Sequence, residues 1–196
     1  MMNLLILHRL CNGMPERHED VNVKSFMSLL KLVKKQSLTI DNACLKPDSE
    51  KNICITFDDG HETDFSIAFQ LLNEVGMAAT FFIVTDWIGK PGFMTKSQIR
   101  EMYNEGMQIG SHSMSHPDFL KINISSIEKE LIESRFKLED ILGAQVTTFA
   151  FPYGNAGSAV IDAVFKSGYQ LCCTSMHGVA YQSSTLLPRN SIHGSM

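Results

Sequence analysis

Apolar segments of strand length alternate with segments of helical periodicity along this chain, and this alternation restricts its fold more than any other feature. Strands are predicted at residues 3–8, 53–57, 78–84, 107–112, 146–151 and 171–174, with a further one within 186–193. Helices are predicted near residues 26–33, 65–72, 95–103, 125–142 and 158–167, with Thr95 as the cap of the third and a capping box at residues 125–128 opening the fourth. The polar residues 41–51 are predicted to form a surface loop. Such alternation, without an internal repeat, predicts one α/β domain with a parallel sheet. Six or seven strand–helix units favour a barrel over an open doubly wound sheet, although periodicity alone leaves both open.

The composition is that of one globular domain, residues 1–196, with 44% apolar and 19% charged residues. A formal net charge of −4 provides no basic field for nucleic acid, so we expect no such partner. The five cysteines form no Cys-x-x-Cys pair, which indicates reduced thiols in a reducing compartment. The amino-terminal apolar run is too short for a signal or transmembrane segment, so we expect a strand there and a cytoplasmic protein.

The strand predicted at residues 53–57 ends in two adjacent carboxylates and a glycine: Asp58, Asp59 and Gly60. Successive strand residues point to opposite sides, so both acids reach one site only where the strand has ended and the chain turns, as Gly60 allows. The carboxyl ends of buried parallel strands are where proteins of this class keep their chemistry. A solvated turn is the alternative interpretation of these three residues taken alone.

His112 and His116 lie four residues apart, at the end of the strand predicted for residues 107–112. Surface histidines are common, so this spacing by itself does not identify a metal site. A carboxylate from the other strand end would supply a third ligand, and two histidines with one carboxylate and a water form an ordinary catalytic zinc site. Only one of Asp58 and Asp59 is then needed as a ligand, which leaves the other free to act as a base.

Three segments resemble, in the right order, the first three motifs of the polysaccharide deacetylases, the fourth carbohydrate esterase family. They are Thr-Phe-Asp-Asp-Gly at residues 56–60, Ser-His-Ser-Met-Ser-His at 111–116 and Phe-Ala-Phe-Pro-Tyr-Gly at 149–154. The similarity covers roughly residues 50–193, with further similarity at the amino end. It implies a distorted (β/α) barrel of about seven parallel strands, which removes acetyl groups from N-acetylated sugars with a divalent metal.

The resemblance also implies roles for individual residues. By position, Asp59, His112 and His116 are the metal ligands and Asp58 is the catalytic base. The backbone N–H of Tyr153 would help to hold the oxyanion. Zn²⁺ is the expected metal, with Co²⁺ or Ni²⁺ as alternatives.

The chain departs from the family pattern at Ala150, where many members carry an arginine that orients the base. Arg189 and Arg9 are candidates to replace it, and a surface position is the alternative for each. The aspartate–tryptophan motif that usually follows is not apparent after Tyr153. Trp87 is the only tryptophan, and we expect it to pack in the core rather than stack on a sugar.

The family's last motif, an apolar strand ending in Leu-x-His, is not apparent near the carboxyl end, but residues 4–8 (Leu-Leu-Ile-Leu-His) have that form. The first and last strands of a closed barrel are neighbours, so we predict a circular permutation in which His8 is the catalytic acid. Alternatively, His8 merely ends a strand and bonds a backbone carbonyl. His193 is the rival acid, although it lies at a chain end, where chains usually fray. The remaining histidines are expected to be solvated or in a loop: His18, His61 and His177.

Two functional hypotheses follow. The leading one is a metal-dependent amidohydrolase that removes N-acetyl groups from N-acetylhexosamine units of a polysaccharide or glycan precursor. The alternative is a non-catalytic glycan-binding module on the same barrel, which the missing arginine and the short carboxyl-terminal tail motivate. The intact acids and histidines favour turnover, because a binding module needs no base beside a metal. In both hypotheses the partner is an N-acetylated glycan.

Overall fold

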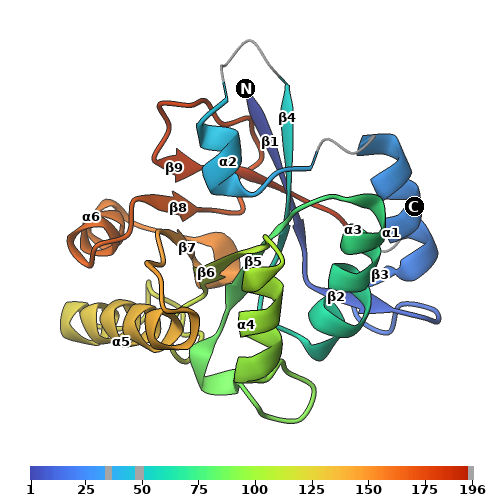
Figure 1. Ribbon diagram of the computed structural model, residues 1–196. Coiled ribbons are helices and arrows are strands. Elements are labelled where there is room, and N and C mark those ends of the chain that lie inside the picture. The colour runs from blue at the N-terminus through green and yellow to red at the C-terminus, as the bar shows by residue number, and fades with distance from the viewer. Residues whose placement is uncertain (34–36, 47–50, 194–196) are drawn as a thin grey trace.

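The chain folds around one all-parallel sheet that curves into a nearly closed barrel with helices outside it (Figure 1). The computed structural model describes residues 1–33, 37–46 and 51–193. The strand order is β10-β1-β4-β5-β6-β7-β8-β9, so each strand from β4 to β8 lies beside its successor. The predicted α/β class and distorted barrel are therefore confirmed, because the apolar strands are buried between the barrel interior and the surrounding helices.

The elements have the following bounds. The barrel strands are β1 (Met2–Leu7), β4 (Asn52–Phe57), β5 (Thr80–Ile83), β6 (Gln108–Ser111), β7 (Thr148–Ala150), β8 (Leu171–Cys173), β9 (Leu186–Leu187) and β10 (Arg189–Ser191). The helices are α1 (Val23–Val33), α2 (Ile40–Cys44), α3 (Gln70–Val75), α4 (Lys96–Asn104), α5 (Ile124–Leu142) and α6 (Ser158–Lys166). Shorter elements are the π-helix η1 (Asp64–Phe69), the 3₁₀ turns η2 (Thr85–Trp87) and η3 (Pro152–Gly154), and the strands β2 (Arg9–Cys11) and β3 (Asp20–Asn22), which form a separate parallel pair.

A single segment near the carboxyl end closes the barrel. This segment consists of β9, which pairs with β8, and β10, which pairs with β1. Only Pro188 separates β9 from β10. Proline has no N–H to donate to a ladder, which explains the break between these two strands. If β9 and β10 are counted as one interrupted strand, the eight described strands of this sheet become seven, which is the expected number.

A small apolar cluster fills the barrel interior. Leu4, Cys54, Phe82 and Leu187 come from four different strands, and each is 0% exposed. Helix α2 closes the amino-terminal end of the barrel over this cluster: its first N–H groups donate to the side chains of the residues that begin β5 and β6, both at 3.1 Å. The opposite end of the barrel, at the carboxyl ends of the strands, is left for the site described below.

Local signals predicted the helices with two errors. A surface loop was expected at residues 41–51, but α2 occupies 40–44; residues 47–50 lie outside the described part of the chain. The capping box expected at residues 125–128 is also wrong, because Asn123 caps α5 by accepting the N–H of Ser126 at 2.9 Å. The cap predicted at Thr95 is confirmed, in a capping box with Gln98.

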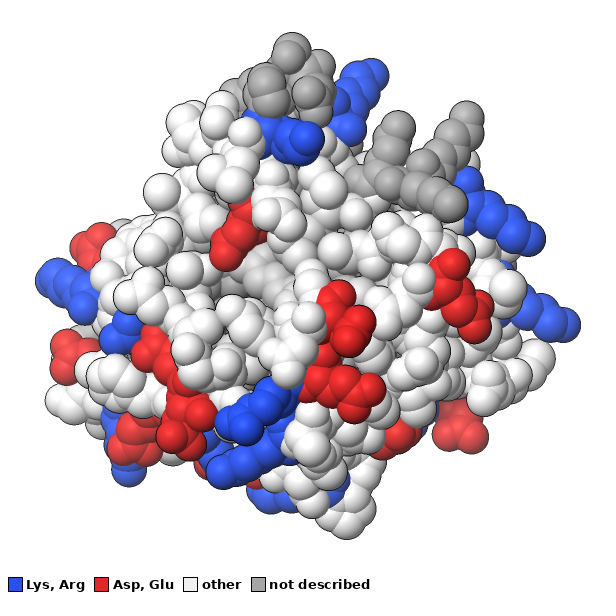
Figure 2. All heavy atoms as spheres, viewed as in Figure 1, with Lys and Arg blue, Asp and Glu red and all other residues white. Residues whose placement is uncertain are grey.

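Neither the thiols nor the surface charges point to a particular ligand or partner. All five cysteines are free thiols, and burial raises the pKa of Cys54 and Cys172 to about 12. Acidic and basic side chains are intermixed on the face in Figure 2, without a broad basic area. Among the described helices, none combines the length and the hydropathy needed to cross a membrane.

Candidate metal centre

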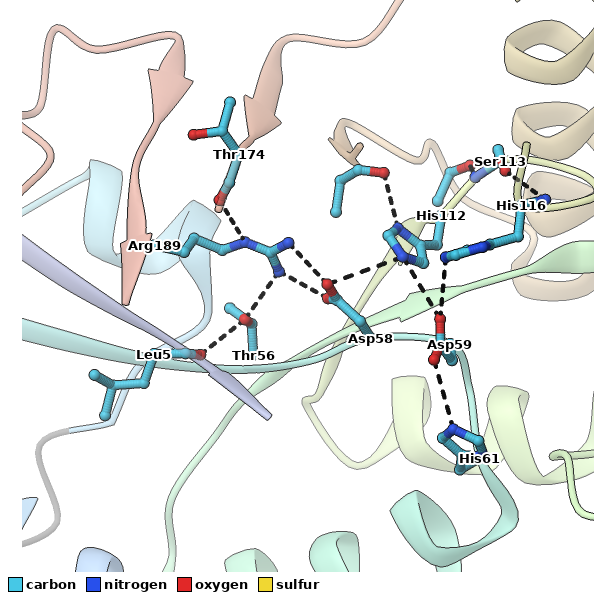
Figure 3. A network of polar contacts seen from close by, with 12 residues as sticks. Leu5, Thr56, Asp58, Asp59, His61, His112, Ser113, His116, Thr174 and Arg189 are labelled. Atoms are coloured by element: carbon cyan, nitrogen blue, oxygen red, sulfur yellow. Dashed lines mark hydrogen bonds and ion pairs between the residues drawn. The ribbon is translucent and has the colours of Figure 1, made fainter. Parts of the chain in front are cut away.

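β4 delivers Asp58 and Asp59 to the carboxyl end of the barrel, where the backbone turns between them. The N–H of Asp58 donates to the carbonyl of Leu7 at 3.0 Å, which continues the contact between β1 and β4. Asp59 and Gly60 then both adopt a left-handed conformation with φ of 80°. The turn therefore brings both carboxylates to one site, as Figure 3 shows.

His112 and His116 come from the turn that follows β6. Glu130 of α5 holds this turn: its carboxylate accepts two backbone N–H groups at 2.8 and 2.9 Å and the hydroxyl of Ser115 at 2.6 Å. The hydroxyl of Ser113 accepts the N–H of His116 at 3.0 Å. Glu130 was not identified from the sequence, because it lies in an ordinary helical pattern and acts on a distant turn.

One carboxylate oxygen and two imidazole nitrogens converge at the rim of the barrel formed by the carboxyl ends of its strands. Oδ1 of Asp59 lies 3.6 Å from Nε2 of His112 and 3.5 Å from Nε2 of His116. One ligand atom from each of the three residues lies within 4.8 Å of the others. Nδ1 of His112 is 2.8 Å from the carbonyl oxygen of Ala150; because that oxygen only accepts, Nδ1 carries the proton and the lone pair remains on Nε2.

The chemistry of this set fits a divalent cation. Oδ1 of Asp59 is buried and has no hydrogen-bond partner within the described chain. Burial raises the pKa of Asp59, but His61 and His112 outweigh that effect and bring it below its usual range. Burial, followed by the neighbouring His112, lowers the pKa of His116 to about 4. The carboxylate is thus ionised and His116 neutral at pH 7, which are the forms that bind metals.

Backbone strain is concentrated at this rim. Among the described residues, the non-glycine positions with positive φ are Asp59 (80°), Ser113 (69°), His116 (64°) and Tyr153 (59°). A left-handed non-glycine residue costs of order 1–3 kcal/mol and persists only where its surroundings hold it. All four belong to the three motif segments, so the fold sustains this strain at the site and nowhere else in the described chain.

Arg189 forms a two-pronged ion pair with Asp58 in the barrel interior. Its two terminal nitrogens donate to the two carboxylate oxygens at 2.7 and 2.8 Å, and its Nε donates to the carbonyl of Thr174 at 3.2 Å (Figure 3). The arginine is 0% exposed. Burial raises the pKa of Asp58, but the charges of Arg189 and His112 reverse this and hold it below its usual range. Asp58 is therefore a fixed, ionised carboxylate.

The other candidate arginine lies elsewhere. Arg9 donates to both carboxylate oxygens of Asp20, at 2.8 and 2.6 Å, and this pair joins β2 to β3. The suggestion that Arg9 orients the base is therefore wrong. It failed because the partner of a long side chain depends on tertiary contacts that the local sequence does not reveal.

The two candidate acids follow two neighbouring strands, β1 and β10. His8 directly follows β1, which is paired with β4 so that Leu7 lies opposite Phe57; His8 therefore comes beside Asp58. His193 lies two residues after β10 and is exposed, with its ring centroid 4.3 Å from that of His18.

His61 differs from its expected position in solvent. Its side chain is only 13% exposed, and its Nε2 lies 3.5 Å from Oδ2 of Asp59, on the other side from His112 and His116. The polar neighbours of His61 in the sequence suggested exposure, but the turn at Gly60 folds it back onto the site. Tyr153, from the third motif, is 63% exposed, and its ring centroid lies 4.9 Å from that of His116.

Known proteins resemble this chain in sequence and in fold. A model of the polysaccharide deacetylase family matches residues 45–172. YxkH of Bacillus subtilis, whose name places it in that family, is 29% identical over 182 residues, which cover 90% of this chain and 65% of YxkH. Among solved structures, polysaccharide deacetylase BC0361 of Bacillus cereus matches with a TM-score of 0.87 and 25% identity, over 100% of this chain and 66% of its own.

A further solved structure shares the fold over nearly its whole length. Deacetylase PplD of Streptococcus pyogenes, in complex with acetate, has a TM-score of 0.90 at 22% identity and is covered to 93% by this chain, all of which is aligned. The chain spans slightly less than two thirds of YxkH and of BC0361. Because the family model matches more than half of its residues, this chain belongs to the polysaccharide deacetylase family.

Proposed function

We propose that this protein is a metal-dependent hydrolase that removes N-acetyl groups from N-acetylhexosamine units of a polysaccharide or glycan precursor. Family membership supports glycan deacetylation, and PplD was solved with acetate, the acid that such a reaction releases. The observation that carries the proposal is the second carboxylate: Asp58 lies beside a ligand set, held ionised by Arg189, yet is not needed as a ligand. A module that only binds glycans has no use for such a base.

The metal would be held by Oδ1 of Asp59 and Nε2 of His112 and His116. We expect Zn²⁺, with Co²⁺ or Ni²⁺ as alternatives. When bound, the cation polarises the acetyl carbonyl and lowers the pKa of a water molecule. Asp58 accepts the proton of the attacking water, and Arg189 keeps the carboxylate in one orientation.

The remaining roles are the oxyanion and the leaving group. The backbone N–H of Tyr153 donates to the acetyl oxygen as its negative charge develops. Gly154 lets the chain here pack closely against Ser175, because a Cβ at that position would collide with Ser175. His8 donates a proton to the departing amine. β1 lies between β10 and β4, the slot that a circular permutation would give to the family's last strand.

Acetate release tests this function. We expect the protein to release acetate from tetra-N-acetylchitotetraose, from its β-1,6-linked counterpart or from peptidoglycan. Release should stop with EDTA and return with Zn²⁺ or Co²⁺. Binding of these glycans without acetate release, in metal-loaded protein, would favour the glycan-binding alternative.

The His116→Ala variant is expected to lose more than about 100-fold in Zn²⁺ affinity, because even a group that only supports a ligand contributes roughly 10–100-fold. The measurement is a competition titration with a chromogenic chelator. His177→Ala is the matched control, since His177 contacts Asn190 rather than the ligand set, and its affinity should not change. Stoichiometric metal in an Asp59→Ala, His116→Ala double variant would show that the ligands are wrongly assigned.

His8→Ala is expected to lower kcat by roughly 10²–10⁴-fold while metal content stays normal, as for removal of a general acid. The basic limb of the pH–rate profile, where the acid deprotonates, should disappear with it. His193→Ala is the comparison and should keep both kcat and the basic limb. The opposite pattern, an active His8→Ala beside an inactive and folded His193→Ala, would end the permutation argument.

A further inference from the structure

A chain of aromatic rings runs past the proposed metal ligands. The distances between ring centroids are 5.1 Å from His61 to Phe93, 4.9 Å from Phe93 to Trp87, 5.3 Å from Trp87 to His116 and 4.9 Å from His116 to Tyr153. The expectation that Trp87 packs in the core is wrong in this respect: Trp87 is only half-buried, at the edge of the site. Two non-ligand aromatic rings, Trp87 and Tyr153, therefore both contact the ring of His116.

The segment that carries Trp87 is held from two directions. The N–H groups of the two residues before Trp87 donate, at 3.2 and 2.9 Å, to carbonyls in the turn between His112 and His116. Farther along, the N–H of Met94 donates to the carbonyl of Gly60 at 3.0 Å. Trp87 thus has a fixed position relative to both loops that provide the ligand set, and little conformational entropy remains to be lost when a ligand contacts it.

Trp87 also has unused binding capacity. Its indole N–H makes no hydrogen bond to the described residues and is not among their fully buried polar atoms, so it keeps some contact with solvent. Its ring contacts Phe93 and His116, and Tyr153 contributes a second, largely exposed ring at the same rim. Small-molecule sites combine apolar and aromatic walls with a few orienting polar groups of this kind.

We infer that Trp87 is a stacking platform for a pyranose ring of the glycan, beside the metal ligands. The C–H groups on one face of a pyranose carry partial positive charge, and the face of an indole carries partial negative charge, so the two surfaces attract each other. The indole N–H is a donor for a hydroxyl or acetamido oxygen of the sugar. This inference rests on the proposed function for its ligand class, and it assigns substrate binding to a residue outside the three motif segments.

Because Trp87 is the only tryptophan, its fluorescence reports on this position alone. With excitation at 295 nm, tetra-N-acetylchitotetraose or its β-1,6-linked counterpart is titrated into metal-loaded Asp58→Asn protein, which should bind without turnover. We expect a saturable change in emission and protection from acrylamide quenching. Calorimetry on the same samples reports binding independently, and the Trp87→Phe variant confirms the origin of the signal.

Kinetics provide the second measurement. Trp87→Ala should raise KM about tenfold with kcat nearly unchanged, as expected for the loss of stacking that is equal in ground and transition states. Trp87→Phe should restore most of the affinity. Phe136→Ala, at an aromatic residue of α5 that is 55% exposed, is the matched control and should behave like the unaltered protein. Metal content is measured for each variant, because Trp87 contacts His116.

The outcomes separate this inference from the proposed function. If a glycan binds by calorimetry, or is deacetylated, while Trp87 emission and the KM of Trp87→Ala stay unchanged, the platform is refuted and the function stands. If Trp87→Ala lowers kcat and metal content rather than affinity, Trp87 only supports His116 and the platform is likewise refuted. If neither oligosaccharide nor peptidoglycan is bound or releases acetate, both proposals fail.

Discussion

The Asp58→Asn variant is expected to keep its metal and lose turnover by roughly 10²–10⁴-fold, the usual contribution of a general base. The amide has nearly the shape of the carboxylate and still offers one oxygen to Arg189, but it cannot accept a proton at neutral pH. The three proposed ligands are untouched. Acetate release measures the turnover, and a chelator assay on the same sample measures the metal.

Two controls make this result specific. Asp162→Asn, at an exposed position in α6, carries the same chemical change away from the site and should keep full activity. Circular dichroism must show folded Asp58→Asn protein, because the substitution leaves the charge of Arg189 buried without its counter-ion. Near-normal turnover in folded, metal-loaded Asp58→Asn protein would mean that a different group activates the water.

Arg189→Met is expected to reduce the free energy of unfolding by about 3–5 kcal/mol at pH 7, the cost of removing one partner from a buried ion pair. Arg189 is 0% exposed and donates to both oxygens of Asp58, so the variant leaves a buried carboxylate without its counter-ion. Urea denaturation in the presence of EDTA measures the change in the metal-free protein.

The pH dependence of this stability loss shows whether the unpaired carboxylate of Asp58 causes it. In the unaltered protein the pKa of Asp58 lies below its usual value, so its contribution is present above about pH 4 and is lost as the pH falls through the lowered pKa. Without Arg189, burial raises that pKa. The stability of Arg189→Met should then be best at acidic pH and fall as the pH rises through the raised pKa. The stability difference between the two proteins should therefore be smaller at pH 4.5 than at pH 7.

Arg9→Met is the matched comparison for this effect. It removes an equivalent pair of donors from Asp20, but Asp20 keeps the backbone N–H groups of Glu16 and Arg17, each at 3.0 Å, and the Arg9 side chain is 25% exposed. The loss should therefore be smaller than for Arg189→Met. An equal or larger loss in Arg9→Met, or no change of the Arg189→Met deficit with pH, would contradict the assigned role of burial.

Much of this protein could be predicted from local sequence. Apolar runs and helical periodicity predicted the β/α alternation, because burial on both faces of a parallel sheet requires apolar residues throughout each strand. The residue types at Asp58, Asp59, His112 and His116 identified a possible metal site before any contact was known, because carboxylates and imidazoles are the usual zinc ligands that these segments contain.

Only the tertiary structure showed which distant residues complete that site. Arg189 lies 131 positions from Asp58, and the two meet because β10 and β4 flank β1 in the closed sheet. Glu130 in α5 holds the turn that carries His112 and His116. Trp87 contacts His116 because its own loop is hydrogen-bonded to that turn and to the turn at Gly60. Periodicity specifies which face of a strand is buried, whereas strand order, register and closure depend on contacts between segments far apart in sequence. Which arginine meets the base and which aromatic ring meets the ligand were therefore decided by how the barrel closes.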